Sequence, residues 1–243
     1  VVVIDDHSSS GGELLNENSL KSSVKTVCGN ISHIKTQTGL HEKLLDAFEG
    51  VDTVFHLAAK ARVQPSIKEP VHFNATNVEG TLNMLEYSRK AKVRRFVFTS
   101  SSSIYGNTEI IPTLEDTPTN PLSPYGLQKL IGEQYCQLYS RIHNMDTACL
   151  RYFNVYGENA PTSGAYCLVI GKFIQQAREG KNLTIYGKGD QKRDFTYLSD
   201  VVDANILASN YTSKFSGEAF NIGNGDNRTV QQIADVFKTP CDY

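Results

Sequence analysis

The stretch Val1-Val2-Val3-Ile4-Asp5-Asp6 decides the fold, because four apolar residues in succession lead into two carboxylates. A continuous apolar run of this kind is typical of a strand buried on both faces of a parallel sheet. Further short runs rich in strand-forming residues lie at 24–28, 53–57, 95–100 and 147–153, separated by helix-like stretches at 40–48, 71–90 and 125–142. This alternation predicts right-handed βαβ crossovers, and hence an α/β fold with a doubly wound parallel sheet.

The chain changes character after residue 153. A polar loop containing proline and glycine is followed by a predicted helix at 169–178, a strand at 183–186, a helix at 200–209, a strand at 219–222 and a helix at 229–237. This pattern predicts a smaller α/β lobe beside the main sheet. We therefore expect a main domain at 1–157 and a second, smaller domain at 158–243, with some of the later chain crossing back to the main domain.

Composition narrows the class of protein. A net charge of −2 over 243 residues argues against a nucleic-acid binder, which usually carries a basic excess. No apolar run approaches the roughly 18 residues of a membrane span, and no export signal opens the chain. Five cysteines without metal-ligand spacing suit a reducing compartment. We expect a cytoplasmic protein that binds neither nucleic acid nor membrane nor metal.

A Tyr-x-x-x-Lys pair stands at the start of the predicted helix at 125–142. The spacing of Tyr125 and Lys129 puts a phenol and an ammonium on one helix face. Lowering a phenol pKa of about 10 by ~3 units requires about 4 kcal/mol, and a nearby cation in a partly desolvated cleft can contribute much of it. The pair can serve as a base, although a surface pair is the commoner meaning of this pattern alone.

Four consecutive serines follow the buried run at 95–98. Ser100–Ser103 would therefore lie at the carboxyl end of a strand, where an open α/β sheet binds its ligands. A hydroxyl there can hydrogen-bond a substrate hydroxyl and relay its proton. A polar loop with serine turns is the competing interpretation of the run by itself.

Together these segments resemble the extended short-chain dehydrogenase/reductase family, and most closely its nucleotide-sugar 4-epimerases. Seven motifs in the family's order carry the resemblance: Val3-Ile4-Asp5-Asp6-His7-Ser8-Ser9, His56-Leu57-Ala58-Ala59, Asn77-Val78-Glu79-Gly80-Thr81, the serine run with Tyr105-Gly106, Ser123-Pro124-Tyr125-Gly126-x-x-Lys129, Leu150-Arg151-Tyr152-Phe153-Asn154-Val155-Tyr156-Gly157 and Arg193-Asp194-Phe195. The resemblance implies that 1–157 is a Rossmann-like NAD-binding domain and that 158–243 binds the substrate.

The resemblance implies NAD as cofactor. Carboxylates at the end of the family's second strand, with which this chain is expected to begin, would take the adenosine ribose hydroxyls and repel a 2′-phosphate. The implied cofactor contacts are Asp5 and Asp6 at the ribose, Asn30 and Ile31 beside the adenine, Leu57, Ala58 and Ala59 at a close backbone approach, Thr76, Tyr125, Lys129 at the nicotinamide ribose, and Phe153 over the nicotinamide. His56 is expected to be structural.

The resemblance also implies a UDP-hexose substrate that is epimerised at C4 through a 4-keto intermediate. Ser101, Tyr125 and Lys129 would form the catalytic set. The implied substrate contacts are Ser101, Ser102 and Tyr125 at the sugar, Asn154 and Arg193 at the diphosphate, and Thr184, Ile185 and Tyr186 at the uracil. A buried structural strand is an equal alternative for 184–186. Relatives commonly dimerise through two helices, which implies a homodimer formed by 71–90 and 125–142.

Other members of the family remain as alternatives. A 4,6-dehydratase resembles Thr-Asp-Glu where Ser101-Ser102-Ser103 stand, and a UDP-glucuronate decarboxylase carries Glu at position 103, so an epimerase fits better. UDP-glucuronate 4-epimerase stays open, and residues 154–174 look like epimerases that accept N-acetylated sugars. The family's first strand and its glycine-rich turn are expected to be absent from this chain, and both the main domain and the substrate lobe are expected to be incomplete, as in a fragment of a longer protein. The alternative is a catalytically silent NAD-sensing or scaffold protein.

Overall fold

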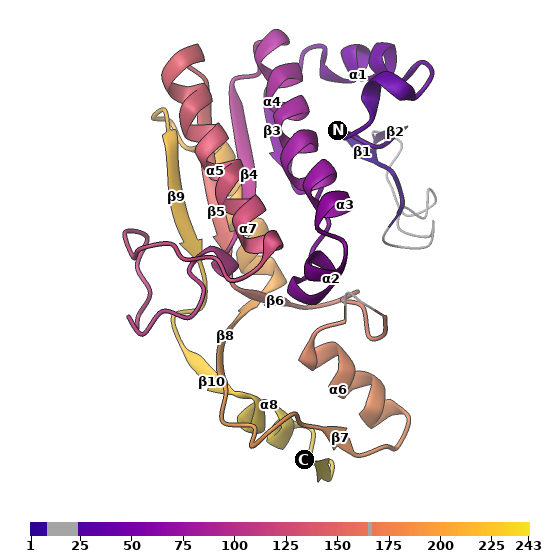
Figure 1. Cartoon of the computed structure of the whole chain (residues 1–243), viewed down its shortest axis with the longest axis vertical. Helices are drawn as coiled ribbons and strands as arrows, with labels where there is room; N and C mark the ends of the chain where they lie inside the picture. The colour runs from indigo at the N-terminus through magenta and orange to yellow at the C-terminus, as the bar shows by residue number, and fades with distance from the viewer. Residues whose placement is uncertain (9–23, 165–166) are drawn as a thin grey trace.

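The computed structural model describes residues 1–8, 24–164 and 167–243. Its main sheet consists of β3 (Thr53–His56), β4 (Arg95–Ser101), β5 (Asp146–Tyr152) and β9 (Ser216–Ile222), in the order β3-β4-β5-β9 (Figure 1). Every pair in this sheet is parallel. The predicted parallel sheet is therefore confirmed. All the strands point toward one edge, where their carboxyl ends gather.

Strands β1 (Val2–Asp5) and β2 (Lys25–Cys28) form a separate parallel pair. The expected absence of a first strand is not confirmed, because the described chain opens with β1. The prediction that the opening run is buried on both faces is wrong: Val2 is 37 % exposed and the rest of β1 is half-buried. The reason is that β1 is hydrogen-bonded to β2 alone among the described strands. Residues 9–23, between them, lie outside the described residues.

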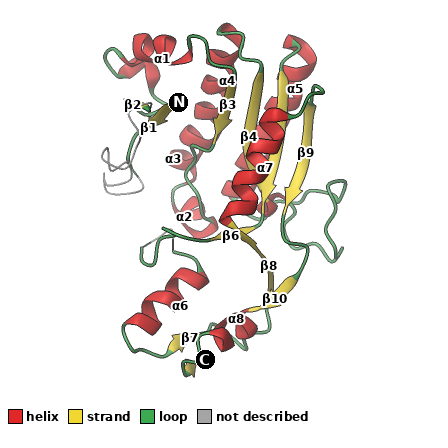
Figure 2. Cartoon of the chain, turned by 180° about the vertical axis from the view of Figure 1, so that it is seen from behind, coloured by secondary structure: helices red, strands yellow, loops and turns green. Residues whose placement is uncertain are grey.

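Helices cover both faces of the main sheet, as a doubly wound fold requires. On one face α1 (Leu40–Phe48), α4 (Thr81–Lys90) and α5 (Pro124–His143) share a core that contains Leu44, Leu85 and Phe98. On the other face α7 (Leu198–Asn210) packs against Val97 and Leu150 through Ala208 (Figure 2). Although both follow residue 158, β9 is a strand of the main sheet and α7 packs on a face of that sheet.

The helix predicted at 71–90 is interrupted. It consists of α3 (Pro70–Asn74), the π-helical turn η2 (Ala75–Gly80) and α4, and the short helix α2 (Val63–Lys68) precedes it. The wide turn buries Asn77, whose side-chain amide donates to the Lys60 carbonyl at 2.9 Å and to Gln128 Oε1 at 2.9 Å. Asn77 thereby ties the loop after β3 to α5, which is a structural role.

The smaller lobe is built around a three-stranded sheet of β10 (Asn227–Thr229), β8 (Lys192–Tyr197) and β6 (Asn154–Tyr156). Its own core joins α6 (Val169–Arg178), α8 (Val230–Val236) and the paired strands β7 (Leu183–Thr184) and β11 (Cys241–Asp242). Phe173, Leu183 and Ile185 are the largest side chains buried there. Figure 1 shows this lobe beyond the carboxyl ends of β4 and β5.

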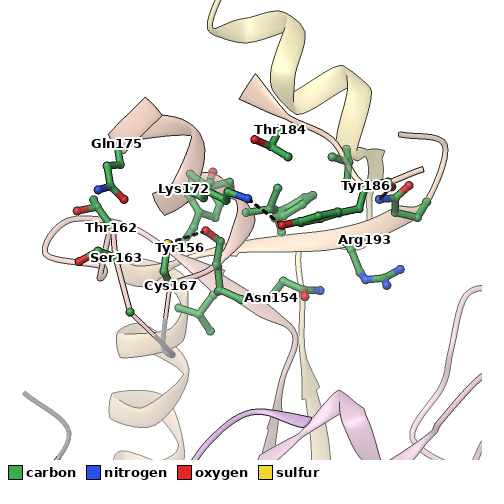
Figure 3. Close-up of a pocket in the computed structure, with 18 residues that line it drawn as sticks. Asn154, Tyr156, Thr162, Ser163, Cys167, Lys172, Gln175, Thr184, Tyr186 and Arg193 are labelled. Atoms are coloured by element: carbon green, nitrogen blue, oxygen red, sulfur yellow. Dashed lines mark hydrogen bonds between the residues drawn. The ribbon is translucent and has the colours of Figure 1, made fainter. Parts of the chain in front are cut away.

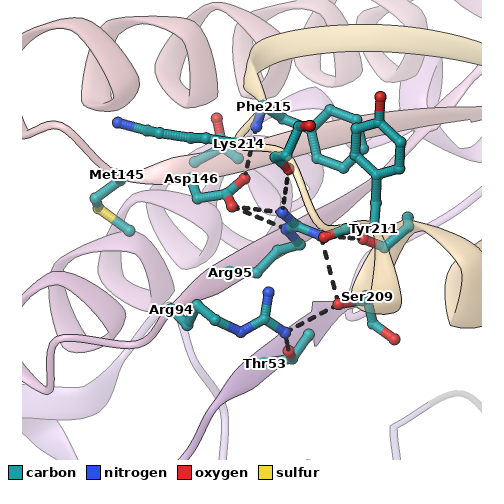
Figure 4. Close-up of polar contacts among 12 residues, drawn as sticks. Thr53, Arg94, Arg95, Met145, Asp146, Ser209, Tyr211, Lys214 and Phe215 are labelled. Atoms are coloured by element: carbon teal, nitrogen blue, oxygen red, sulfur yellow. Dashed lines mark hydrogen bonds and ion pairs between the residues drawn. The ribbon is translucent and has the colours of Figure 1, made fainter.

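Arg95 lies at the opposite end of the main sheet, where β4 begins. Its guanidinium is 1 % exposed and binds Asp146 Oδ2 at 2.6 and 3.0 Å (Figure 4). It also donates to the carbonyls of Ala208, Tyr211 and Ser213, at 2.6, 2.7 and 2.8 Å, and lies over the Phe215 ring. These bonds fasten the loop after α7 to the start of β4 and β5, so this end of the sheet is structural.

Candidate functional site

Tyr125 lies in the first turn of α5, at the carboxyl end of β4. Ser123 caps the helix by accepting the Gly126 N–H at 3.1 Å, and the Tyr125 N–H donates to Ser66 Oγ at 3.1 Å. The Ser101 hydroxyl lies near enough to the phenol to affect its pKa. Burial raises the pKa of the phenol above its usual range, while the Ser101 contact and the charge of Arg62 lower it less strongly. The predicted lowering of the Tyr125 pKa is therefore not found in the chain by itself.

Lys129 is buried one turn further along α5. Its Nζ donates to the Thr99 carbonyl at 2.7 Å and lies 5.1 Å from the centroid of the Phe98 ring. Burial lowers the pKa of this ammonium to about 8. Lys129 is directed to the Thr99 carbonyl of β4, and the charge that lowers the pKa of Tyr125 in the chain by itself is that of Arg62, so the tuning of Tyr125 by Lys129 stays a prediction.

Ser101 and Ser102 stand where β4 passes into the short 3-10 turn η3 (Ser102–Ile104). Ser101 is the N-cap of that turn: its Oγ accepts the Ser103 N–H at 3.1 Å and also contacts Ser103 Oγ at 3.1 Å. It is 7 % exposed and lowers the pKa of the Tyr125 phenol. The structure thus brings Ser101 and Tyr125 together where β4 ends and α5 begins, while their catalytic roles stay predictions.

A buried ion pair supports this strand end. Ser100 Oγ donates to Glu133 Oε1 at 2.5 Å, and Arg151 binds both Glu133 oxygens at 2.9 and 2.8 Å. Arg151 also donates to the Tyr105 hydroxyl at 2.6 Å, and that hydroxyl donates to Asn221 Oδ1 at 2.7 Å. Because these groups satisfy one another, they fix the backbone that carries Ser101. Two of the sequence motifs, Tyr105-Gly106 and Leu150-Arg151, therefore supply the frame of the site.

The residues expected at the adenosine end gather at the ends of β1 and β2. Asp6 Oδ2 accepts the Asn30 amide at 2.9 Å, and Asp5 Oδ1 accepts the His7 N–H at 2.6 Å. Burial raises the pKa of Asp6, but hydrogen bonds from Ser8 and the charge of Lys60 outweigh it and leave the pKa below its usual value. An ionised carboxylate suits ribose hydroxyls, so the geometry is compatible with the role expected of Asp6.

The other expected cofactor residues divide into accessible and buried groups. Leu57 and Ala58 are exposed after β3, and Ala59 is half-buried beside them. Thr76, on η2, is 8 % exposed, and its Oγ1 has no hydrogen-bond partner among the described residues. Ile31 is 6 % exposed and packed in the main core, so its side chain is not available to an adenine ring.

A cavity of about 570 Å³ opens on the small lobe (Figure 3). Asn154, Thr184, Tyr186 and Arg193 line it, as do Cys167 and Lys172. Asn154 donates to the Asp194 carbonyl at 2.9 Å, whereas Arg193 is exposed and, among the described residues, donates only to the Lys192 carbonyl. Lys172 Nζ reaches the Tyr186 hydroxyl at 3.1 Å. An exposed guanidinium such as that of Arg193, with N–H donors that are not taken up by the described residues, suits an anionic ligand.

The sequence left two interpretations open for 184–186, namely a ligand-binding strip and a buried structural strand, and each describes some of its residues. Thr184 and Tyr186 line the cavity, and Tyr186 is 74 % exposed. Ile185 between them is 2 % exposed and belongs to the core of the small lobe. A period of two places neighbouring side chains on opposite faces, which explains the split.

Phe153 is half-buried between β5 and β6, beside Gly223. Residues 165–166 lie outside the described residues.

Sequence reasoning missed Arg62, whose charge lowers the pKa of the Tyr125 phenol. His56, in contrast, is structural as expected: it is 4 % exposed and stacks on Phe96 and Phe98. Thr81 Oγ1 donates to the Asn77 carbonyl, so it accepts the His56 Nε2 proton at 2.9 Å. Burial, and then the charge of Lys129, lower the pKa of His56 to about 3.

A family model described as "NAD dependent epimerase/dehydratase family" matches residues 2–223, and the chain belongs to this family. A protein of Methanocaldococcus jannaschii, provisionally named a UDP-glucose 4-epimerase, is 41 % identical over 192 residues, which are 79 % of this chain and 61 % of that protein. The chain thus spans less than two thirds of this relative.

Solved structures show the same similarity. The UDP-N-acetylglucosamine 4-epimerase of Methanobrevibacter ruminantium, in complex with UDP-N-acetylmuramic acid, superimposes with a TM-score of 0.88 at 30 % identity, over 97 % of this chain and 72 % of that one. The UDP-glucose 4-epimerase of Thermotoga maritima, with UDP-glucose, gives a TM-score of 0.87 at 33 % identity, over 100 % of this chain and 77 % of that one. No helix among the described residues is long and apolar enough to cross a membrane.

Proposed function

We propose that this protein catalyses NAD-dependent 4-epimerisation of a UDP-hexose, by transient oxidation at C4 through a 4-keto sugar. The observation that carries the proposal is that Ser101, at the end of β4, and Tyr125, in the first turn of α5, lie near enough for Ser101 to affect the pKa of the phenol. A hydroxyl relay at this edge can move the proton of a substrate alcohol. Membership of the NAD dependent epimerase/dehydratase family and the likeness to epimerases of two UDP-sugars support the same reaction.

The described residues fit NAD. Thr76 Oγ1 is a buried hydroxyl that lacks a partner among the described residues, and a bound cofactor would supply one. The ionised Asp6 beside Asn30 suits the adenosine ribose, and the accessible Leu57 and Ala58 leave the end of β3 open to a ligand. When bound, NAD⁺ supplies an oxidised nicotinamide ring that accepts hydride.

The remaining roles follow from position and chemistry. Tyr125 takes the proton of the C4 hydroxyl at its Oη, directly or through Ser101. Ser102 contacts the sugar, and Lys129 holds the nicotinamide ribose with its buried ammonium. Phe153 covers the nicotinamide. The diphosphate lies between Asn154 and Arg193, and Thr184 and Tyr186 receive the uracil in the cavity. Ile185 has no part in this, because it is buried in the core.

The serine run favours epimerisation over elimination or decarboxylation. A 4,6-dehydratase needs an acid and a base at C6, and the positions that would supply them are Ser101, Ser102 and Ser103. A serine hydroxyl at these positions cannot replace the carboxyl groups that would act as the acid and the base. An epimerase needs no acid or base at C6, because hydride returns to the same carbon and no net oxidation results.

Product analysis tests the proposal. Wild-type protein, supplied with NAD⁺, is incubated separately with UDP-galactose, UDP-N-acetylgalactosamine and UDP-glucuronate, and products are identified by NMR. We expect a C4 epimer from one of the two neutral sugars. Tyr125→Phe should reduce kcat at least about 10³-fold, whereas the same change at the distant Tyr211 should have no effect.

Other products would redirect the proposal. Conversion of UDP-glucuronate alone would make the protein a UDP-glucuronate 4-epimerase, and a 4-keto-6-deoxy product from dTDP-glucose would make it a dehydratase. Bound nicotinamide without any turnover would favour an NAD-sensing or scaffold protein. Full activity of Tyr125→Phe would show that the assigned base is wrong.

We further propose a homodimer formed by the outer faces of α3–α4 and α5. Apolar side chains stand exposed along these helices: Val71, Leu127, Leu138 and Ile142. Burial of such a surface in a second copy would stabilise the pair. Light scattering during gel filtration should give twice the chain mass, and Leu138→Lys with Ile142→Lys should give the monomer.

A further inference from the structure

A second cavity, of about 490 Å³, opens at the amino ends of β4 and β5, at the opposite end of β4 from Ser101. Its lining comes from the ends of α4 and α5, from the residues that lead into β4 and β5, and from the loop before β9. The volume lies within the range of small-molecule sites and is close to the 570 Å³ of the cavity on the small lobe. The proposed epimerase site uses none of the residues that line this second cavity.

The lining of this basic cavity is strongly cationic. Five lysine and arginine side chains line it against a single carboxylate, namely Arg89, Lys92, Arg94, Arg95 and Lys214 against Asp146. His143 adds an imidazole. Because the whole chain carries a net charge of −2, this concentration of positive charge is local and does not follow from the composition.

The carboxylate of Asp146 is already satisfied. Its Oδ2 accepts two hydrogen bonds from Arg95, and its Oδ1 accepts the Phe215 N–H at 3.0 Å (Figure 4). Arg95 is 1 % exposed, and its donors are taken up by Asp146 and by the loop carbonyls after α7. This pair is therefore structural and neutral as a unit, so the charge of the cavity comes from the other cations.

The two exposed arginines each keep one side of the guanidinium available. Arg89 binds Glu86 through Nε and Nη2, and Arg94 binds Asp52 through the same two nitrogens. Nη1 of each arginine makes no hydrogen bond to the described residues. Neither Glu86 nor Asp52 lines the cavity. Both arginines can therefore donate to an anion without giving up their carboxylate partners.

The two lysines of the cavity carry charge that no carboxylate balances among the described residues. Lys92 is exposed, and its Nζ has no hydrogen-bond partner in the part of the chain that the structure describes. Lys214 Nζ donates to the Asn144 carbonyl at 2.9 Å and to the Asn144 side-chain oxygen, which are both neutral acceptors. The lysines thus add two positive charges to the cavity.

The helix ends at the cavity offset only part of this charge. A helix C-terminus is equivalent to about −0.5 elementary charge, so the ends of α4 and α5 together balance roughly one of the two lysines. Lys92 also has a φ of 55°, in the left-handed region that side chains other than those of asparagine and aspartate seldom adopt. Such backbone conformations concentrate at functional sites. A surplus of positive charge therefore remains beside donors that are not taken up.

We propose that the basic cavity binds a phosphate chain, meaning two or more linked phosphates that are either free or carried by a nucleotide. Guanidinium and ammonium groups are the side chains that proteins use to bind phosphate oxygens. The available cations come from separate segments around a cavity of nucleotide size, so a single phosphate would engage few of them and a chain would engage more. The inference does not depend on the proposed epimerase reaction.

Calorimetric titration with tripolyphosphate tests the proposal, at about 150 mM salt so that weak surface attraction is screened. Orthophosphate, ATP and UTP are titrated in the same way. The cavity variant is Lys92→Gln with Lys214→Gln. The matched control is Lys43→Gln with Lys188→Gln, two exposed lysines that line neither cavity. Arg193→Met distinguishes binding in the cavity of the small lobe.

We expect one equivalent of tripolyphosphate to bind, at least about tenfold more tightly than orthophosphate, because it engages more cations. The cavity variant should bind it about 10- to 100-fold more weakly, whereas the control variant and Arg193→Met should bind it as the wild type does. Equal affinities for ATP, UTP and tripolyphosphate would show that the phosphates alone are recognised. Tighter binding of one nucleotide, lost in the cavity variant, would identify a nucleotide as the source of the chain.

A footprint of the wild-type protein gives a second measurement that needs no variant. Brief reaction with an amine-acylating reagent, followed by mass spectrometry, reports the accessibility of each lysine. Tripolyphosphate should protect Lys92 and Lys214 and leave Lys43 and Lys188 reactive. Because the protein is unaltered, a folding defect cannot explain the result.

Three results would overturn the inference: no binding of tripolyphosphate to the wild type, equal weakening in the cavity and control variants, or full reactivity of Lys92 and Lys214 at saturating tripolyphosphate. Orthophosphate that binds as tightly as tripolyphosphate would overturn the assignment to a phosphate chain. Binding that is lost in Arg193→Met and retained in the cavity variant would place the anion in the small lobe and would also overturn the inference.

Discussion

The two sides of the candidate site are built differently. On the main sheet, Ser101 and Lys129 are buried, and each is held by protein partners. On the small lobe, Tyr186 and Arg193 are exposed, and the cavity that they line is open. The groups proposed for chemistry are thus fixed before any ligand arrives, whereas the groups proposed for binding await one.

This difference separates stability from affinity. The buried side carries ion pairs and hydrogen bonds whose loss leaves an unsatisfied polar group in the core, which is costly. The exposed side carries side chains whose removal leaves nothing stranded. Substitutions on the first side should therefore affect the free energy of unfolding, and substitutions on the second should affect the dissociation constant of the UDP-sugar.

The largest expected effect is a loss of stability in acid, caused by the buried His56 of the main sheet. The pKa of His56 is about 3 in the folded chain and about 6.5 in the unfolded one, so below pH 6.5 the unfolded state binds more protons. Stability should fall by up to about 5 kcal/mol between pH 6.5 and 3. Urea unfolding at several pH values measures this. His56→Gln should flatten the slope, and an unaltered slope would show that other groups cause the acid sensitivity.

The next effect comes from the ion pair beneath Ser101. Arg151→Met leaves Glu133 buried at 1 % exposure without its bidentate partner, which should cost about 3–5 kcal/mol of unfolding free energy. Urea denaturation at neutral pH is the measurement. Arg94→Met is a suitable control, because the Arg94–Asp52 pair is exposed and should contribute less than about 1 kcal/mol. Equal losses in the two variants would contradict the distinction between buried and exposed sides.

The smallest effect on stability is expected on the small lobe. Arg193→Met should change the unfolding free energy by less than about 0.5 kcal/mol, since the side chain is exposed. It should weaken UDP binding about 10- to 100-fold by removing a charge-assisted contact to phosphate. Calorimetric titration with UDP measures this, with Arg178→Met, on the exposed end of α6, as the control. Unimpaired binding would place the diphosphate elsewhere.

Much of the fold could be predicted because periodicity records burial. The helices at 40–48 and 169–178 coincide with α1 and α6, and the strands at 95–100 and 147–153 differ from β4 and β5 by one residue at the ends. The π-helical turn at Ala75–Gly80 could not be predicted, because a single turn with i→i+5 hydrogen bonds is too short to change the periodicity that is read over a helix-long window.

The site was predictable as a set of residues but not as a set of interactions. The motif placed Tyr125, Ser101 and Lys129 at one strand end, yet spacing alone assigned the acidifying charge to Lys129. Nothing in the sequence shows that Lys129 Nζ is taken up by the Thr99 carbonyl. Arg62 escaped for a related reason: a positive φ on an arginine leaves no trace in composition or periodicity.

The central claim is that hydride leaves C4 of the sugar and returns to the same carbon within one site. UDP-hexose carrying deuterium at C4 tests it most directly, with wild-type protein and NAD⁺ in ordinary water. The account predicts that the C4 epimer forms with its deuterium fully retained. Product in which C4 has acquired hydrogen from the solvent, or product whose deuterium has been released to water, would contradict the account.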